Sequence, residues 1–275
     1  MGVESRLLVA GSIAIDSLQG GLITDELGGS ALYFALAACR LMPLTVVAPV
    51  GRDAEARVRA VLGCRPGIDL TGLSVVDAPT YRWFSDAEAG RNVDLGSLDS
   101  IYDHWSPELP RGYRGWAFVG SMRPDRQLEA VRQLAGCGLL AADAMRSYVE
   151  SAPEAARSVL RVTDWYFCNQ EEFSALGGSD PEGFREAWEL DGLVLKHGPG
   201  GVTAYTGAGA VHVPANAKRV VDTTGAGDAL AGGMLACWLL QGADPARLRE
   251  ALQVGVDYAS LTISEVGAAA LTRPA

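Results

Sequence analysis

The chain lacks the motifs that mark several familiar kinds of site. Its five cysteines form no Cys-x-x-Cys pair and its three histidines no His-x-x-x-His pattern, so neither a zinc site nor a disulfide framework is expected. A phosphate-binding Gly-x-x-x-x-Gly-Lys-Ser/Thr run is absent, because neither Lys196 nor Lys218 follows a glycine. The dinucleotide fingerprint fails as well, because Leu230 stands where the pair Gly225-x-Gly227 would need a third glycine. No Gly-x-Ser-x-Gly elbow occurs.

Basic residues and long apolar runs are also scarce. The 23 basic and 33 acidic residues give a net charge of −10, which argues against a nucleic-acid groove or an anionic membrane surface as partner. No apolar run reaches about 18 residues without interruption, and the first eight residues do not resemble a signal peptide. With 48% hydrophobic residues, the chain can bury a substantial core. We therefore predict a cytoplasmic protein that binds small molecules.

Short apolar runs alternate with helix-like segments along most of the chain. This alternation favours an α/β fold with a mostly parallel sheet and helices on both faces. A hairpin is predicted over 202–213. The predicted strands cover 7–11, 46–51, 116–120, 139–143, 165–169 and 193–198, and the predicted helices cover 31–41, 53–62, 125–135, 153–162, 170–176, 228–241 and 245–263.

The alternation stops between about 67 and 110. This stretch has strand propensity but no convincing helix, and we interpret it as a small β lid that covers a substrate. Its aromatic residues, Trp83 and Phe84 among them, fit packing as well as ligand contact. The predicted organisation is one domain over 1–275, with the lid formed by 67–110 and part of 14–27.

The segment 220–230 joins an apolar run, a glycine turn, a carboxylate and an apolar helix. A helix that begins at Gly225–Asp228 presents unpaired N–H groups and the positive end of its dipole, so its turn can bind an anion. Asp228 would repel that anion, unless it accepts a proton from a group attacking the anion. Phosphoryl transfer to a hydroxyl requires this arrangement, although an ordinary helix start gives the same local pattern.

The run from Asp222 to Asp228, Asp-Thr-Thr-Gly-Ala-Gly-Asp, resembles at all seven positions the C-terminal signature of the ribokinase-like (PfkB) carbohydrate and nucleoside kinases. The resemblance implies a ribokinase-like three-layer α/β/α fold and an ATP-dependent carbohydrate kinase. It assigns Asp228 as the general base and the backbone of Gly225, Ala226 and Gly227 as the anion hole. A sugar or polyol is the expected acceptor; a nucleoside kinase and a non-catalytic ligand-binding protein of the same fold remain alternatives.

Residues near the N-terminus resemble the substrate site of that family. Gly28 and Gly29, ahead of a predicted helix, are similar to the family's glycine pair, and Asp16 matches an aspartate that binds substrate hydroxyls. Tyr33 stands where many sugar kinases carry Asn, and a core tyrosine is equally compatible. The substrate-binding residues implied by the resemblance are Asp16, Gly28, Gly29, Ser30, Tyr33 and Asp222.

Two further segments resemble the nucleotide side of the family site. Asn169 and Glu172 are spaced to share one helix face, as a helix-capping pair or as oxygen ligands for Mg²⁺. The family's Asn-x-x-Glu motif favours Mg²⁺, held mainly through water. The segment 196–201 resembles the family's strand and glycine turn beside the nucleotide, although an ordinary Gly-rich turn gives a similar pattern. The nucleotide-binding residues implied are Asn169, Lys196, Gly198, Gly201, Thr223 and Thr224.

Asp143 and Arg146 resemble an Asp-x-x-Arg segment on the phosphate side of the family cleft, although a surface ion pair is the simpler interpretation of Arg146. The expected ligands are ATP, Mg²⁺ and a sugar, polyol or nucleoside. Nucleic acid and membrane are not expected as partners. A monovalent cation such as K⁺ and a homodimer formed through the lid are left open.

Overall fold

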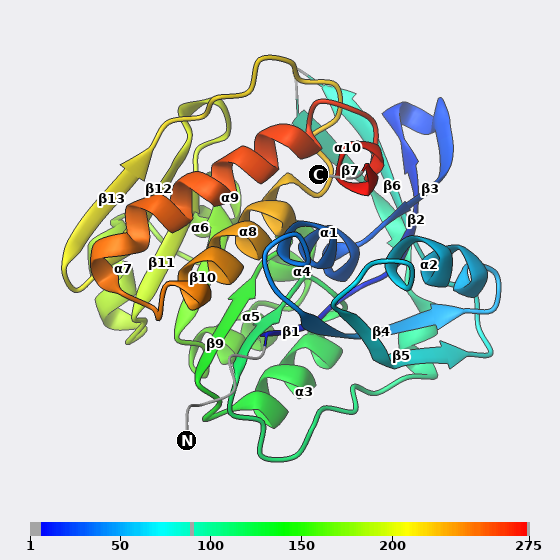
Figure 1. The fold of residues 1–275 in the computed structure, drawn as a ribbon, viewed down its shortest axis with the longest axis horizontal. Helices are drawn as coiled ribbons and strands as arrows, with labels where there is room; N and C mark the ends of the chain where they lie inside the picture. The colour runs from blue at the N-terminus through cyan, green and yellow to red at the C-terminus, as the bar shows by residue number, and fades with distance from the viewer. Residues whose placement is uncertain (1–6, 89–90, 274–275) are drawn as a thin grey trace.

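The computed structural model describes residues 7–88 and 91–273, and the strands of these residues form two sheets. The larger sheet has nine strands in the order β13-β12-β11-β10-β9-β8-β1-β4-β5 (Figure 1). From β11 to β5 neighbouring strands run parallel, and β12 is antiparallel to both its neighbours. Its strands are β1 (Leu7–Ala10), β4 (Leu44–Gly51), β5 (Ile68–Val76), β8 (Trp116–Val119), β9 (Leu139–Asp143), β10 (Trp165–Asn169), β11 (Gly192–Lys196), β12 (Val202–Thr206) and β13 (Gly209–Val213).

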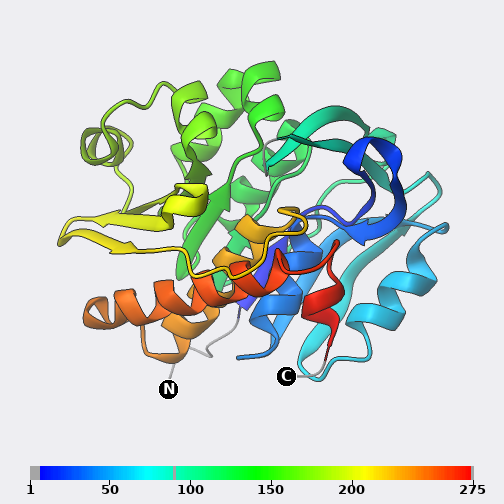
Figure 2. The same ribbon diagram turned by 90° about the horizontal axis from the view of Figure 1, so that it is seen from above.

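Helices cover both faces of this sheet (Figures 1 and 2). The first face carries α1 (Ser30–Ala38), α2 (Glu55–Leu62), α8 (Ala226–Leu240), α9 (Leu248–Thr262) and α10 (Ala269–Thr272). The second carries α3 (Pro124–Leu134), α4 (Arg146–Ser151), α5 (Pro153–Leu160), α6 (Gln170–Ala175) and α7 (Pro181–Ala187). Short 3-10 turns occupy Gln19–Gly21, Ser100–Asp103, Gly198–Gly200 and Pro245–Arg247. Within the described ranges, no helix is long and apolar enough to cross a membrane.

The side chains of the central strands divide between two apolar cores. Along β10, Trp165 and Phe167 pack in the core beneath α1 and α8, whereas Tyr166 and Cys168 pack in the core beneath α3 and α5. Such alternation is expected for a parallel strand that is buried on both faces. The predicted three-layer α/β/α fold is confirmed.

The second sheet contains most of the segments predicted to form a lid, and we call it the lid sheet, or lid. It has four strands in the order β3-β2-β6-β7, namely β2 (Ala14–Leu18), β3 (Ile23–Gly28), β6 (Tyr81–Glu88) and β7 (Arg91–Leu98). Because β2 follows β1 and β6 follows β5, the lid lies beyond the carboxyl ends of those two strands (Figure 2).

The predicted lid stretch 67–110 begins too early. Ile68–Val76 is the edge strand β5 of the large sheet, parallel to β4. The physical reason lies in its apolar side chains: Ile68 and Leu73 pack in the same core as Val58 of α2, which completes an ordinary β4–α2–β5 unit. The alternation of strands and helices therefore includes β5, although the polar residues of this stretch suggested that it stops before residue 67.

Helices α1 and α8 pack against each other through a glycine. A Cβ atom on Gly232 of α8 would lie 2.5 Å from the carbonyl oxygen of Phe34 in α1. Phe34 in turn stacks on Phe118 of β8, with the ring centroids 4.6 Å apart. The absence of a side chain at residue 232 therefore sets the distance between the two helices.

We expect Gly232→Ala to destabilise the protein by about 1–3 kcal/mol, because the added methyl group must separate the helices. Helix propensity alone predicts the opposite, a gain of about 1 kcal/mol. Chemical denaturation measures the difference. Gly207→Ala is the control, since a Cβ atom there meets nothing within 4 Å and should change stability by less than about 0.5 kcal/mol. A Gly232→Ala protein as stable as the parent would contradict this account of the packing.

Candidate active site

Polar and charged side chains gather at the carboxyl ends of the central strands, where open α/β sheets bind ligands. Asp143 ends β9, Asn169 ends β10 and Lys196 ends β11. Asp228, in the first turn of α8, interacts electrostatically with Asp143 and Lys196. Asp16, from lid strand β2, also interacts with Asp228. The fold therefore brings together residues from both halves of the sequence.

The turn before α8 is held by the carboxylate of Asp222, which is buried. Its Oδ1 accepts hydrogen bonds from the Thr224 backbone N–H (3.0 Å) and hydroxyl (2.7 Å), and its Oδ2 accepts one from the Gly267 N–H (2.9 Å). Gly225 has a φ of 73°, a conformation that favours glycine. The resemblance placed Asp222 with the substrate. These hydrogen bonds show that its carboxylate stabilises the turn.

The turn presents donors for an anion. Among the backbone hydrogen bonds of the described residues, none starts from the N–H of Gly225 or Gly227, whereas the Ala226 N–H donates to the Thr223 carbonyl at 3.3 Å. The ammonium of Lys196 lies against the turn, because a Cβ atom on Gly227 would be only 2.8 Å from its Nζ. An anion here meets two open N–H groups, a helix N-terminus and a largely buried ammonium group.

The Asp228 carboxyl group lies at the edge of this donor set. Its Oδ1 is shielded from solvent and has no hydrogen-bond partner among the described residues. Burial raises the pKa of Asp228 to about 6, and the positive charge of Lys196 opposes that rise. Burial and the neighbouring Asp228 carboxylate hold the pKa of Asp143 well above its usual range, since two adjacent carboxyl groups do not readily ionise together. Near neutral pH, Asp228 can therefore accept a proton.

Asn169 and Glu172 form the helix-capping pair that their spacing allowed. Asn169 Oδ1 accepts from the Glu172 N–H (2.9 Å), and Glu172 Oε2 accepts from the Asn169 N–H (2.7 Å). The same Glu172 oxygen lies 3.9 Å from Lys196 Nζ. The capping function fixes both side chains at the carboxyl end of β10, near the lysine that lies against the turn before α8.

The carboxylate oxygens near this turn are suited to a magnesium ion that keeps most of its water ligands. Asp143 Oδ1 and Asp228 Oδ1 are buried without partners, and carboxylate oxygens are the ligands that Mg²⁺ prefers. In the described part of the chain, no group of three acidic, histidine or cysteine side chains is placed to hold a metal directly. Mg²⁺ bound here would therefore depend on water and on phosphate oxygens, as is usual for this ion.

Asp16 brings a further buried carboxyl group close to Asp222 and Asp228. Only 2% of it is exposed, and its Oδ1 has no partner among the described residues. Burial and then the Asp222 carboxylate raise its pKa well above the usual range. Gly28 lies directly against this carboxyl group, because a Cβ atom there would be 2.0 Å from Asp16 Oδ2.

Gly29 and Ser30 hold the start of α1 against the loop after β1. Gly29 has a φ of 100°, and a Cβ atom there would lie 2.4 Å from the Ser12 carbonyl oxygen. The Ser30 hydroxyl accepts from the Ser12 N–H (3.0 Å) and donates to the Ser121 carbonyl (2.9 Å). Ser30, grouped with the substrate residues by resemblance, uses its hydroxyl to join α1 to the loops after β1 and β8.

Tyr33 is a core residue that keeps a hydroxyl group without a partner among the described residues. Its side chain is fully buried, and its ring lies under the turn before α8, 2.2 Å from where a Cβ atom of Gly225 would be. Burial and then the Asp16 carboxylate raise the pKa of Tyr33 well above its usual range, so the phenol stays neutral beside Asp16.

Two of the remaining predicted residues, Gly198 and Gly201, form a turn, and Arg146 lies on the surface. Gly198 and Gly201 have φ values of 57° and 93° and close a tight turn in which the His197 N–H donates to the Gly201 carbonyl at 2.8 Å. Arg146 is half exposed and forms ion pairs with Glu150 (2.8 Å) and Glu171 (3.1 Å). The surface ion pair expected from the sequence joined Arg146 to Asp143, three residues earlier, but Asp143 is buried and Arg146 pairs with the two glutamates instead.

Sequence reasoning missed one residue at this site. Asn92 of lid strand β7 donates from Nδ2 to the Thr224 hydroxyl at 2.6 Å and lies 3.4 Å from Asp222 Oδ1. The residue belongs to the stretch where the α/β alternation stops, and nothing in its neighbourhood distinguishes it from other polar residues of a hairpin. Only the folded lid brings it to the turn.

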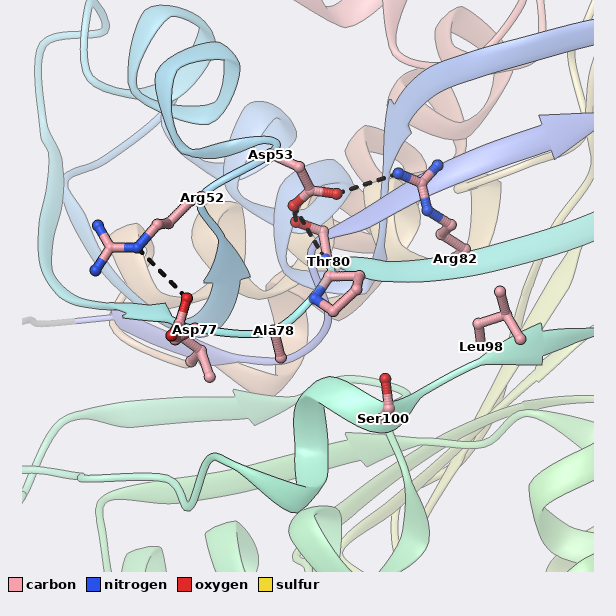
Figure 3. A pocket seen from close by; sticks show the side chains of 10 residues that line it. Arg52, Asp53, Asp77, Ala78, Thr80, Arg82, Leu98 and Ser100 are labelled. Atoms are coloured by element: carbon pink, nitrogen blue, oxygen red, sulfur yellow. Dashed lines mark hydrogen bonds and ion pairs between the residues drawn. The ribbon is translucent and has the colours of Figure 1, made fainter.

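A separate pocket of about 670 Å³ lies at the base of the lid, lined by residues that do not belong to the predicted site (Figure 3). Asp53 accepts hydrogen bonds there from Thr80 and from Arg82 Nη2 (3.1 Å). Arg82 pairs with Ile15 in the lid sheet, whereas Asp16 is the next residue along β2. Since successive side chains of a strand point to opposite faces, Arg82 lies on the face of the lid opposite to Asp16. These bonds fix the lid to the turn between β4 and α2.

Comparisons with known proteins agree with this architecture. Residues 118–274 match the pfkB family of carbohydrate kinases. An ATP-dependent ribose-1-phosphate kinase of Halopiger xanaduensis is 28% identical over 258 residues, 88% of this chain and 81% of the relative. A cytidine kinase of Thermococcus kodakarensis is 24% identical over 246 residues, 84% and 87% of the two chains. The aminoimidazole riboside kinase of Salmonella enterica superposes with a TM-score of 0.80 at 23% identity, covering 98% of this chain and 96% of that one.

The fold and these matches define an ATP-dependent kinase that phosphorylates a hydroxyl group. Since the family match extends over more than half of the chain, the chain belongs to the pfkB family of carbohydrate kinases.

The raised pKa of Asp228 predicts a pH dependence. A base must be deprotonated to act, so kcat/KM should fall as the pH drops through about 6 and stay level above that value. Initial rates of ADP formation between pH 4.5 and 8.5 measure the profile. An acid limb near the ordinary aspartate pKa of about 4 would contradict a base whose pKa is raised by burial, and a profile without an acid limb would contradict a carboxylate base.

Proposed function

We propose that the enzyme transfers the γ-phosphoryl group of ATP to the hydroxymethyl group of a ribosyl compound, free or substituted at C1. The observation that carries this proposal is the buried Asp228 carboxyl group, whose Oδ1 has no hydrogen-bond partner among the described residues, beside the open N–H groups of Gly225 and Gly227. The ribosyl part rests on the relatives, because the compounds in their names all contain a ribosyl group: ribose 1-phosphate, cytidine and aminoimidazole riboside. A free sugar or polyol remains within the same class.

Asp16 is proposed to bind the acceptor. A buried carboxylate oxygen without a partner costs free energy unless a donor reaches it, and vicinal hydroxyl groups supply two donors at once. Gly28 leaves the space that this contact needs. In this arrangement the acceptor's hydroxymethyl group faces Asp228.

The chemical step follows from the charges. Asp228 accepts the proton as the acceptor oxygen forms a bond to the γ-phosphorus, and the bond from that phosphorus to the β,γ-bridging oxygen breaks to release ADP. The N–H groups of Gly225 and Gly227 and the Lys196 ammonium stabilise the charge on the transferred group. The anion hole implied by resemblance is thereby proposed to include Lys196 in place of the Ala226 N–H, which is already bonded.

The nucleotide is proposed to lie along the ends of β10 and β11. Asn169, Lys196, Gly198, Gly201, Thr223 and Thr224 are the residues assigned to it, and Asn169 and Glu172, with Asp143, would hold Mg²⁺ through waters. When bound, Mg²⁺ neutralises phosphate charge. We also propose that the chain folds as one domain with the lid as its appendage.

A nucleoside acceptor is favoured by one observation. Trp83 pairs with Asp16 in the lid sheet, so both side chains lie on the same face. Its indole N–H donates to Asp94 at 3.0 Å, which holds a partly exposed ring beside Asp16. A flat base on C1 of the ribose could stack there, since base–aromatic stacking contributes about 1–3 kcal/mol.

Removal of the base tests the proposed chemistry. We expect Asp228→Asn to reduce kcat by about 10²–10⁴-fold, while ATP affinity stays within a few-fold because the N–H donors remain. Steady-state ADP release and equilibrium ATP binding measure the two quantities. Near-normal turnover would reject Asp228 as the base. If the parent binds an acceptor tightly but releases no ADP, the chain is a non-catalytic binding protein.

An acceptor screen separates the substrate classes. With ATP and Mg²⁺, the panel contains ribose, ribose 1-phosphate, cytidine, adenosine, fructose and myo-inositol. For a nucleoside kinase, Trp83→Ala should raise the KM for cytidine or adenosine by roughly five- to 100-fold, with kcat for ribose unchanged. Equal effects on ribose and on the nucleosides would reject base stacking at Trp83, and turnover of fructose or inositol alone would reject a ribosyl acceptor.

A further inference from the structure

The lid touches the catalytic turn at one defined place. Asn92 lies on β7, an edge strand of the lid sheet, and its side-chain amide reaches Thr224, the residue directly before the glycine whose φ is 73°. In Figure 2 the gold segment that precedes α8 runs up to the lid strands. The contact joins residues 132 positions apart in the sequence.

The hydrogen bonds at this place form a directed series. The Asn92 amide donates to the Thr224 hydroxyl (2.6 Å), the same hydroxyl donates to Asp222 Oδ1 (2.7 Å), and Asp222 Oδ2 accepts from the Gly267 N–H (2.9 Å). Thr224 and Asp222 are both buried. Since an amide N–H can only donate, the Thr224 hydroxyl proton is directed to Asp222 when the lid is in this position. Polar groups joined in series strengthen one another.

We propose that Asn92 is a positioning residue that links closure of the lid to the geometry of the anion-binding turn. With Asn92 in place, the Asp222–Thr224 turn is held in the form that directs the N–H groups of Gly225 and Gly227 outward. Without it, the Thr224 hydroxyl is free to rotate away from Asp222, and the turn loses one of its restraints.

The consequence concerns the order of events. Asp16 is on β2 and Asn92 on β7 of the same lid sheet, so an acceptor that draws Asp16 inward also brings Asn92 to the turn. The anion hole then reaches its final geometry when the acceptor is present, which limits transfer of the phosphoryl group to water. This inference rests on the proposed function of the same site.

Three variants separate the donor from the shape of the side chain. Asn92→Asp keeps the shape but replaces a donor by a carboxylate that only accepts and that repels Asp222. Asn92→Ala removes both. Asn216→Ala is the matched control, because Asn216 also bonds through its amide, to Asp257 of α9 at 2.7 Å, and its described contacts do not involve the lid.

The first measurement is hydrogen exchange of the backbone amides of Thr224, Ala226 and Gly267, all of which donate hydrogen bonds in this arrangement. We expect exchange there to accelerate roughly three- to tenfold in Asn92→Ala and at least as much in Asn92→Asp, with no change in Asn216→Ala. Exchange across 81–87 should stay as in the parent. Equal exchange of the three amides in the parent and both Asn92 variants would overturn the proposal, as would acceleration that spreads through the lid.

The second measurement is turnover with ATP and either ribose or cytidine. We expect kcat to fall roughly three- to tenfold in Asn92→Ala, at least as far in Asn92→Asp, and not at all in Asn216→Ala. An Asn92→Asp enzyme with parental kcat would overturn the proposal, because shape alone would then suffice. If the parent phosphorylates neither compound, the proposed function fails for these acceptors, while the exchange measurement still decides the role of Asn92.

Discussion

The carboxylate of Asp222 is the contact on which the geometry of the site depends. One oxygen holds Thr224 and the other holds Gly267, so the turn before α8 is tied to the loop after α9. A helix N-terminus offers N–H donors wherever it occurs, but they stabilise a developing charge only when they are fixed beforehand. The buried Asp222 supplies that rigidity at the place where phosphoryl transfer is proposed.

The candidate site contains a lysine and open N–H groups although the chain as a whole is acidic. The chain carries a net charge of −10, and the carboxyl groups of Asp16, Asp143 and Asp228 lie close enough to interact. Lys196 is the ammonium group that interacts with Asp143, Asp228 and Glu172. A polyanion can bind beside these groups because the N–H groups of Gly225 and Gly227 are open and this lysine lies against them, and because buried carboxyl groups with raised pKa values carry less than their full charge.

The sequence predicted most of the fold because its strands are short apolar runs with buried neighbours on both sides, such as Trp165–Asn169. It failed where local propensity was weak: Pro181–Ala187 and Arg146–Ser151 are short helices that packing stabilises. The site residues in consecutive motifs, Asp222 to Asp228 above all, were recognisable because their spacing is local. The contact of Asn92 and the engagement of Ser30 with Ser12 are set by tertiary structure, and no local pattern encodes them.

The lid is not a continuous piece of chain. Its middle strands, β2 and β6, come from 14–18 and 81–88 and run parallel to each other, so neither half can complete the sheet alone. Parallel pairing requires the intervening β4–α2–β5 unit as its crossover. Exchange of the whole lid between two relatives would therefore require two replaced segments, one that carries β2 and β3 and one that carries β6 and β7. Replacement of 67–110 alone would pair the original β2 with a β6 strand from the other protein.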